Sequence, residues 1–150
     1  MIGPEEAALK IADARARLLT FAGGCSVQQW CSSPLGEADD PRSVSVIVDH
    51  VADAYDYIYG WLTTLVGGGA VEVSPDIVDE LNARHAEKAA LIELDEVAAH
   101  LRTSGDVLIG FVEQLSADDL IIDDGRVALF CEIAARHADS HRIELEAGLA

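Results

Sequence analysis

The sequence predicts an all-α protein, a four-helix bundle whose helices are joined by long connections. Four long stretches carry apolar residues at the three- and four-residue spacing of a buried helical face. Glycine clusters and prolines separate these stretches, for example at Gly23-Gly24 and at Gly67-Gly68-Gly69. Strand-like alternation of convincing length is absent, since the one candidate, residues 70–74, is too short. We therefore expect residues 1–150 to form a single helical domain.

The first two main helices are predicted over residues 4–23 and 43–66. Pro4 followed by two glutamates suits the first turn of a helix, where proline is tolerated and acidic side chains face the positive end of the dipole. The second stretch has the seven-residue recurrence of a bundle seam, at Val44, Val51, Ile58 and Leu65. Residues 23–42 are predicted to be a long connection with one short turn near 27–30.

The second half of the chain predicts a short helix over residues 77–90 and two more main helices. Leucines recur every seven residues from 94 to 115, and we expect them to face Val51, Ile58 and Phe130; they are Leu94, Leu101, Leu108 and Leu115. Gly105 and Gly110 inside this stretch indicate a bend or a close helix contact. Residues 116–125 are an acidic loop with room for one helical turn, and the last helix should run over 126–147, which lacks Gly and Pro.

Composition excludes several classes of protein. A net charge of −17 leaves no basic surface that could displace counterions from a nucleic acid. No apolar run approaches the roughly 20 residues that span a bilayer, and the first residues lack the basic and apolar regions of a signal peptide, so we expect a cytoplasmic protein. Cys25, Cys31 and Cys131 are an odd number without a CxxC motif, which favours reduced thiols over a disulfide framework.

Two histidines in the last helix are the first candidates for a functional site. His137 and His141 stand four residues apart, which places both imidazoles on one helical face about one turn apart. They belong to an apolar stripe, made of Val127, Phe130, Ala134, His137, His141 and Leu145. A polar group in such a core position needs a partner. That partner is either one shared metal ion, or backbone carbonyls and the other histidine.

His50 is the natural third metal ligand, because it borders the apolar seam of the second main helix. Three neutral imidazoles leave coordination positions open to water or substrate, as catalytic metal sites do. His85 and His100 fall on less apolar faces, and we expect both to be solvated. Three acids lie within a turn of the proposed ligands and are candidates for orienting an imidazole, namely Asp53, Asp139 and Glu144.

Other metal and phosphate motifs are missing. Ala138 follows His137, so the glutamate of an HExxH metalloprotease is absent. The paired Glu-x-x-His motifs of a carboxylate-bridged di-iron bundle do not occur, and neither does a glycine-rich phosphate loop.

Taken together, these residues resemble the DinB-like superfamily, which includes the N-terminal domain of mycothiol-dependent maleylpyruvate isomerase. The motifs concerned are Val48-Asp49-His50-Val51, Leu81-Asn82, Asp95-Glu96-Val97 and Arg136-His137-Ala138-Asp139-Ser140-His141-Arg142. The resemblance implies a four-helix bundle in which His50, His137 and His141 hold a divalent ion, often zinc or nickel. The chain departs from the family pattern at Arg42, where an aromatic residue is common.

The resemblance also implies a function, because characterised relatives include thiol S-transferases and an isomerase that use mycothiol or bacillithiol. We therefore expect a metal-dependent thiol S-transferase acting on a small thiol and an electrophile. The alternatives are a non-catalytic or regulatory metal-binding bundle, and a bundle whose histidines are purely structural. Since a net charge of −17 would repel anionic thiols, we expect Arg42, Arg136 or Arg142 near the site.

The superfamily commonly pairs its bundles, so the resemblance predicts a homodimer. Trp30, Trp61 and Tyr59 offer large apolar surface near helix ends, of the kind enriched at interfaces.

Overall fold

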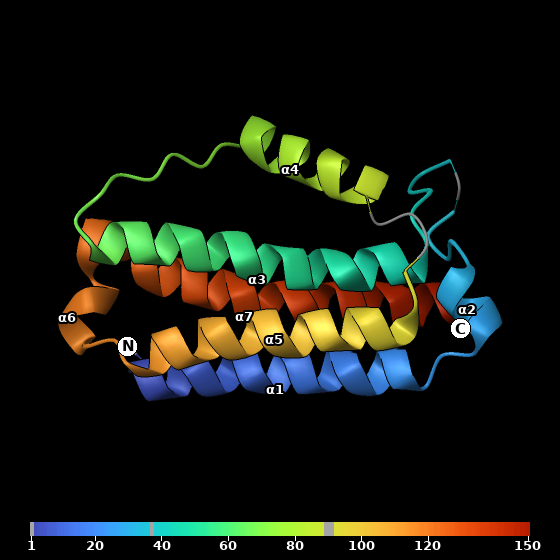
Figure 1. The fold of residues 1–150 in the computed structure, drawn as a ribbon, viewed down its shortest axis with the longest axis horizontal. Coiled ribbons are helices and arrows are strands. Elements are labelled where there is room, and N and C mark those ends of the chain that lie inside the picture. The colour runs from blue at the N-terminus through green and yellow to red at the C-terminus, as the bar shows by residue number, and fades with distance from the viewer. Residues whose placement is uncertain (1, 37, 89–91) are drawn as a thin grey trace.

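The computed structural model describes residues 2–36, 38–88 and 92–150, and this part of the chain contains helices and no strand. The helices are α1 (Pro4–Gly23), α2 (Val27–Cys31), α3 (Val44–Val66), α4 (Pro75–Lys88), α5 (Leu94–Glu113), α6 (Ala117–Leu120) and α7 (Ile122–Leu149) (Figure 1). The predicted all-α class is confirmed. No helix in the described part is both long and apolar enough to cross a membrane.

Four long helices pack side by side as a bundle. α1 and α7 run in one direction, and α3 and α5 run in the other (Figure 1). α1 packs against α5 and α7, and α3 packs against the same two helices, so α1 and α3 face each other across the diagonal. Because the long helices α3 and α5 run parallel, the chain between them must return along the length of the bundle. α4 forms part of this crossover and lies against α3.

The helix boundaries follow local signals. The Ser43 side chain accepts a hydrogen bond from the amide of Val46 and caps α3, and α4 begins at a proline, two residues before the predicted start. The predicted end of that helix at Ala90 lies outside the described residues. In α7, positive φ angles from Asp123 to Gly125 interrupt the helix, so its regular part starts at residue 126 as predicted.

The predicted leucine seam of α5 faces the core. Leu101 and Leu108 are fully buried, Leu115 is 9% exposed, and Leu94 is partly buried against the same cluster. Gly105 marks a close helix contact, because a Cβ there would lie 2.7 Å from Cδ of Arg15 on α1. The Arg15 guanidinium passes this point and donates to the carbonyl of Arg102 at 2.8 Å. Gly110 has no such neighbour.

The first half of α3 is buried on every side. All nine residues from 44 to 52 are buried, including the polar side chains of Ser45, Asp49 and His50. α5 and α7 cover two faces of α3, while α2 and α4 add contacts from outside the bundle. A helix enclosed in this way has no solvent-facing side to which a polar residue could turn.

We predict that Leu108→Ala lowers the free energy of unfolding by about 2–5 kcal/mol, because it leaves a cavity in a close-packed core. The matched control is the adjacent Val107→Ala, since Val107 is 48% exposed and its truncation should change stability by less than about 0.5 kcal/mol. Urea unfolding of both variants checks this. Equal losses would contradict the inward orientation of Leu108.

Candidate metal centre

Three histidines from two neighbouring helices meet inside the bundle. His50 comes from α3, and His137 and His141 come from α7. The Nε2 atoms of His50 and His137 are 2.9 Å apart, and one nitrogen from each of the three rings lies within 4.8 Å of the others. The ring centroids are 4.5–5.2 Å apart, edge to face. The structure therefore brings together the three residues that the sequence singled out, and the group could hold a metal ion.

Small side chains of α7 let the two helices approach at this point. Ala134 and Ala138 are at most 1% exposed, and they flank the histidines on the buried face. Phe130 and Leu145 continue the same stripe and are buried as predicted.

Burial keeps the histidines neutral. Burial is the largest cause, and together with the charges of neighbouring histidines and of Arg42 it lowers the pKa of His50 to about 2 and that of His137 to about 4. Burial also lowers the pKa of His141. All three imidazoles are therefore uncharged near neutral pH, which is the form that binds a metal ion.

Hydrogen bonding alone does not satisfy the cluster. Three neutral imidazoles carry three N–H donors, but the rings share only the hydrogen bond between His50 and His137. Nδ1 of His50 and Nδ1 of His141 are buried without a hydrogen-bond partner among the described residues, and such atoms are costly to bury. Two nitrogens on one tetrahedral zinc lie about 3.3 Å apart, which is near the 2.9 Å between Nε2 of His50 and Nε2 of His137. The three imidazoles could therefore hold a divalent ion.

The three acids suggested as partners of the ligands do not orient them. Glu144 Oε2 lies 3.8 Å from His141 Nδ1, beyond hydrogen-bond distance. Asp139 turns toward α1, where it forms an ion pair with Arg17 at 2.8 Å. Asp53 has no hydrogen bond to a cluster histidine within the described ranges.

The expectation that His85 and His100 are solvated is wrong. His85 of α4 is 8% exposed, and its Nε2 lies 2.7 Å from Oδ2 of Asp49. His100 of α5 is one-third exposed, with Nδ1 2.7 Å from the other oxygen of Asp49 and Nε2 3.0 Å from Asp56. Both histidines face the protein interior because α4 and α5 pack against α3 beside the buried carboxylate of Asp49.

A second cluster is formed by Asp49, His85 and His100. It contains charged groups, whereas the cluster of His50, His137 and His141 is neutral. Burial by itself would raise the pKa of Asp49, but hydrogen bonds from His100 and His85 outweigh burial and lower that pKa to about 2. The hydrogen bond to Asp49 raises the pKa of His100 to about 9. His100 and Asp49 therefore form an ion pair at neutral pH.

One of the three expected arginines lies near the histidines. The charge of Arg42 contributes to the lowered pKa of each member of the cluster. Arg142 pairs with Glu146 and with Asp139. Arg136 is exposed and pairs with Glu132.

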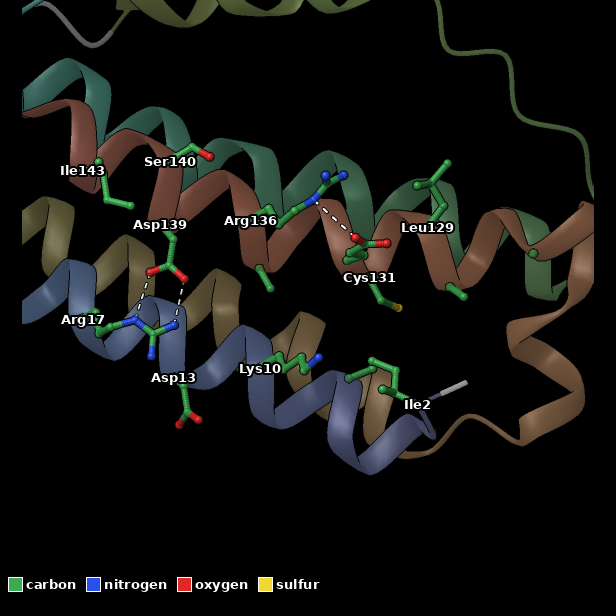
Figure 2. Close-up of a pocket in the computed structure, with 15 residues that line it drawn as sticks. Ile2, Lys10, Asp13, Arg17, Leu129, Cys131, Arg136, Asp139, Ser140 and Ile143 are labelled. Carbon is green, nitrogen blue, oxygen red and sulfur yellow. Dashed lines mark hydrogen bonds and ion pairs between the residues drawn. The ribbon is translucent and has the colours of Figure 1, made fainter.

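A cavity of about 860 Å³ lies elsewhere, in a groove between α1 and α7. Arg17, Asp139 and Arg136 line it, and Figure 2 shows the Arg17–Asp139 ion pair bridging the two helices. Cys131 borders this groove, but burial raises the pKa of its thiol to about 11 and makes it a poor nucleophile. None of the three histidines lines the groove.

Comparison of the chain with protein-family models, with curated proteins and with solved structures finds no match.

We predict that the contribution of His100 to stability falls as the pH rises through 9. Its folded pKa of about 9 lies above the unfolded value of 6.5, so the stabilisation is complete below pH 6.5 and is lost between these values. Asp49 stays ionised throughout this window. Urea unfolding of wild-type protein and His100→Gln should give a larger difference at pH 6 than at pH 9.5. A difference independent of pH would refute the ion pair.

Proposed function

We propose that the protein is a metal-dependent transferase of the DinB-like four-helix type, which activates a small thiol at the cluster of His50, His137 and His141. The convergence of three neutral imidazoles, one buried and two partly buried, supports the metal-binding part of this proposal most directly. The resemblance of the motifs around these histidines supports the thiol chemistry. Imidazole ligands suit zinc and nickel, which are the metals that the resemblance implies.

The chain's own residues would hold the metal ion and attract the thiol substrate. The three histidines supply neutral lone pairs and leave at least one coordination position open. A bound divalent ion would stabilise the thiolate form of an incoming thiol near neutral pH. The thiol proton goes to solvent, and the thiolate sulfur forms a bond to an electrophilic carbon. The electron pair displaced from that carbon leaves with the leaving group or takes up a proton.

Arg42 is suited to attracting an anionic thiol in a strongly acidic chain. Its Nε and Nη2 bind the Asp40 carboxylate, with the shortest contact at 2.7 Å. Nη1 has no protein partner among the described residues, so it remains available to a carboxylate of the substrate.

A non-catalytic or regulatory metal-binding role is the second candidate, and one observation favours it. His50 is 2% exposed, and neither the α1–α7 groove nor the cavity of about 190 Å³ beside Trp30 is lined by a cluster histidine. A substrate would need access that these two cavities do not provide.

The homodimer and the cytoplasmic location stay predictions. The aromatic residues proposed for the dimer surface contribute to the core, since Trp30 is buried, Trp61 packs on Phe130 and Tyr59 packs on Phe111.

We predict that protein purified without a histidine tag binds one equivalent of zinc or nickel. His137→Ala should weaken binding by more than about 100-fold, because loss of a direct ligand exceeds the effect of losing an outer partner. Arg136→Ala is the matched control, as this neighbouring side chain is exposed and should leave affinity unchanged. Metal analysis and competition with a chelator check this. Unchanged binding by His137→Ala would exclude the site.

We also predict metal-dependent thiol consumption when the protein is offered a small thiol and a panel of electrophiles. Metal-loaded wild-type protein should turn over, whereas metal-stripped protein and His141→Ala should not. Equal rates in all three would show that the site does not perform this chemistry. Metal binding without any turnover would favour the non-catalytic role.

A further inference from the structure

The metal-binding cluster has a neighbour that the proposed mechanism does not use. The ring of His85 lies against the ring of His50, with centroids 5.9 Å apart and planes tilted by 54°. His85 comes from α4, outside the four long helices. Within residues 75–86 it is the one buried side chain of that helix. The deepest contact of α4 with the bundle is therefore made beside a proposed metal ligand.

Asp49 fixes the position of His85. Its carboxylate is 5% exposed, and each oxygen is engaged at 2.7 Å, one by His85 and the other by His100. Two helices thus hold one carboxylate from different sides, so its rotation is restricted. A histidine bonded to such a carboxylate has a defined orientation.

His50 itself has little else to hold its ring. Its Nδ1 is buried and has no hydrogen-bond partner in the part of the chain that the structure describes, and Nε2 faces His137. The orientation of the ring therefore depends on packing. His137 and His141 contact it edge to face, and the tilted ring of His85 is the fourth member of this group.

We propose that His85 is a positioning residue of the metal centre: α4 delivers it, Asp49 orients it, and its ring keeps His50 turned with Nε2 toward His137. This proposal rests on metal binding by the three-histidine cluster. It assigns a role to the long crossover between α3 and α5, which otherwise adds a mostly polar helix to an already complete bundle. Partners that orient a metal ligand from outside typically change metal affinity by about 10- to 100-fold.

The chain offers a matched pair of variants for the test. His85→Ala and His100→Ala each remove one of the two partners of Asp49, but only His85 contacts His50. Metal-free protein is titrated with cobalt(II), and its visible absorption reports both affinity and ligand geometry. His85→Ala should bind cobalt about 10- to 100-fold more weakly and with an altered spectrum, whereas His100→Ala, which leaves the His85 ring beside His50 and its bond to Asp49 in place, should lose clearly less affinity.

A second variant distinguishes the effect of the His85 ring on His50 from the effect of attaching α4 to α3. His85→Gln retains a donor for Asp49 but lacks the ring, and it too should bind cobalt more weakly. Circular dichroism and thermal unfolding of the metal-free variants establish that the bundle is intact. Equal losses in His85→Ala and His100→Ala, or unchanged affinity in both His85 variants, would overturn the proposal. Wild-type protein that binds no cobalt overturns it together with the proposed function, while cobalt binding without thiol turnover contradicts the thiol chemistry alone.

Discussion

The adjacent polar residues Asp49 and His50 impose the main constraint on this fold, because both are buried in the first half of α3. A buried carboxylate without a partner costs several kcal/mol, and a buried imidazole needs a partner for each nitrogen. Their side chains leave the helix about 100° apart, so no single neighbour can satisfy both. α4 and α5 supply histidines to Asp49, while α7 supplies them to His50. The arrangement of three helices around α3 thus meets a polar requirement as well as an apolar one.

Histidine is neutral in one of the two clusters around α3 and charged in the other. Burial among other imidazoles lowers the pKa of His50 to about 2, whereas the carboxylate of Asp49 raises that of His100 to about 9. The neutral group suits a cation that brings its own charge, and the charged pair suits a structural link.

Sequence spacing predicted the long helices and the three-histidine cluster, because both depend on periodicity within a helix. His137 and His141 share a face by geometry alone, and His50 borders a clear apolar seam. The burial of His85 was missed because it depends on contacts between residues 36 positions apart, made by a helix with a weak apolar face. A signal was present in α3, whose residues 44–52 are apolar apart from Ser45, Asp49 and His50. An acid within such a stretch implies a buried partner from elsewhere in the chain.

The attachment of α4 links the crossover to the cluster energetically. α4 packs only on α3 among its main contacts, so its detachment should cost less than unfolding of the bundle. If His85 orients His50, the detached form binds metal more weakly than the attached form. An ion that binds one form better shifts the equilibrium toward it, and the coupling is reciprocal. Metal binding would then hold α4 in place, just as α4 holds the ligand. A polar helix with one buried histidine is well suited to this, since stronger apolar packing would fix α4 whether or not the site were filled.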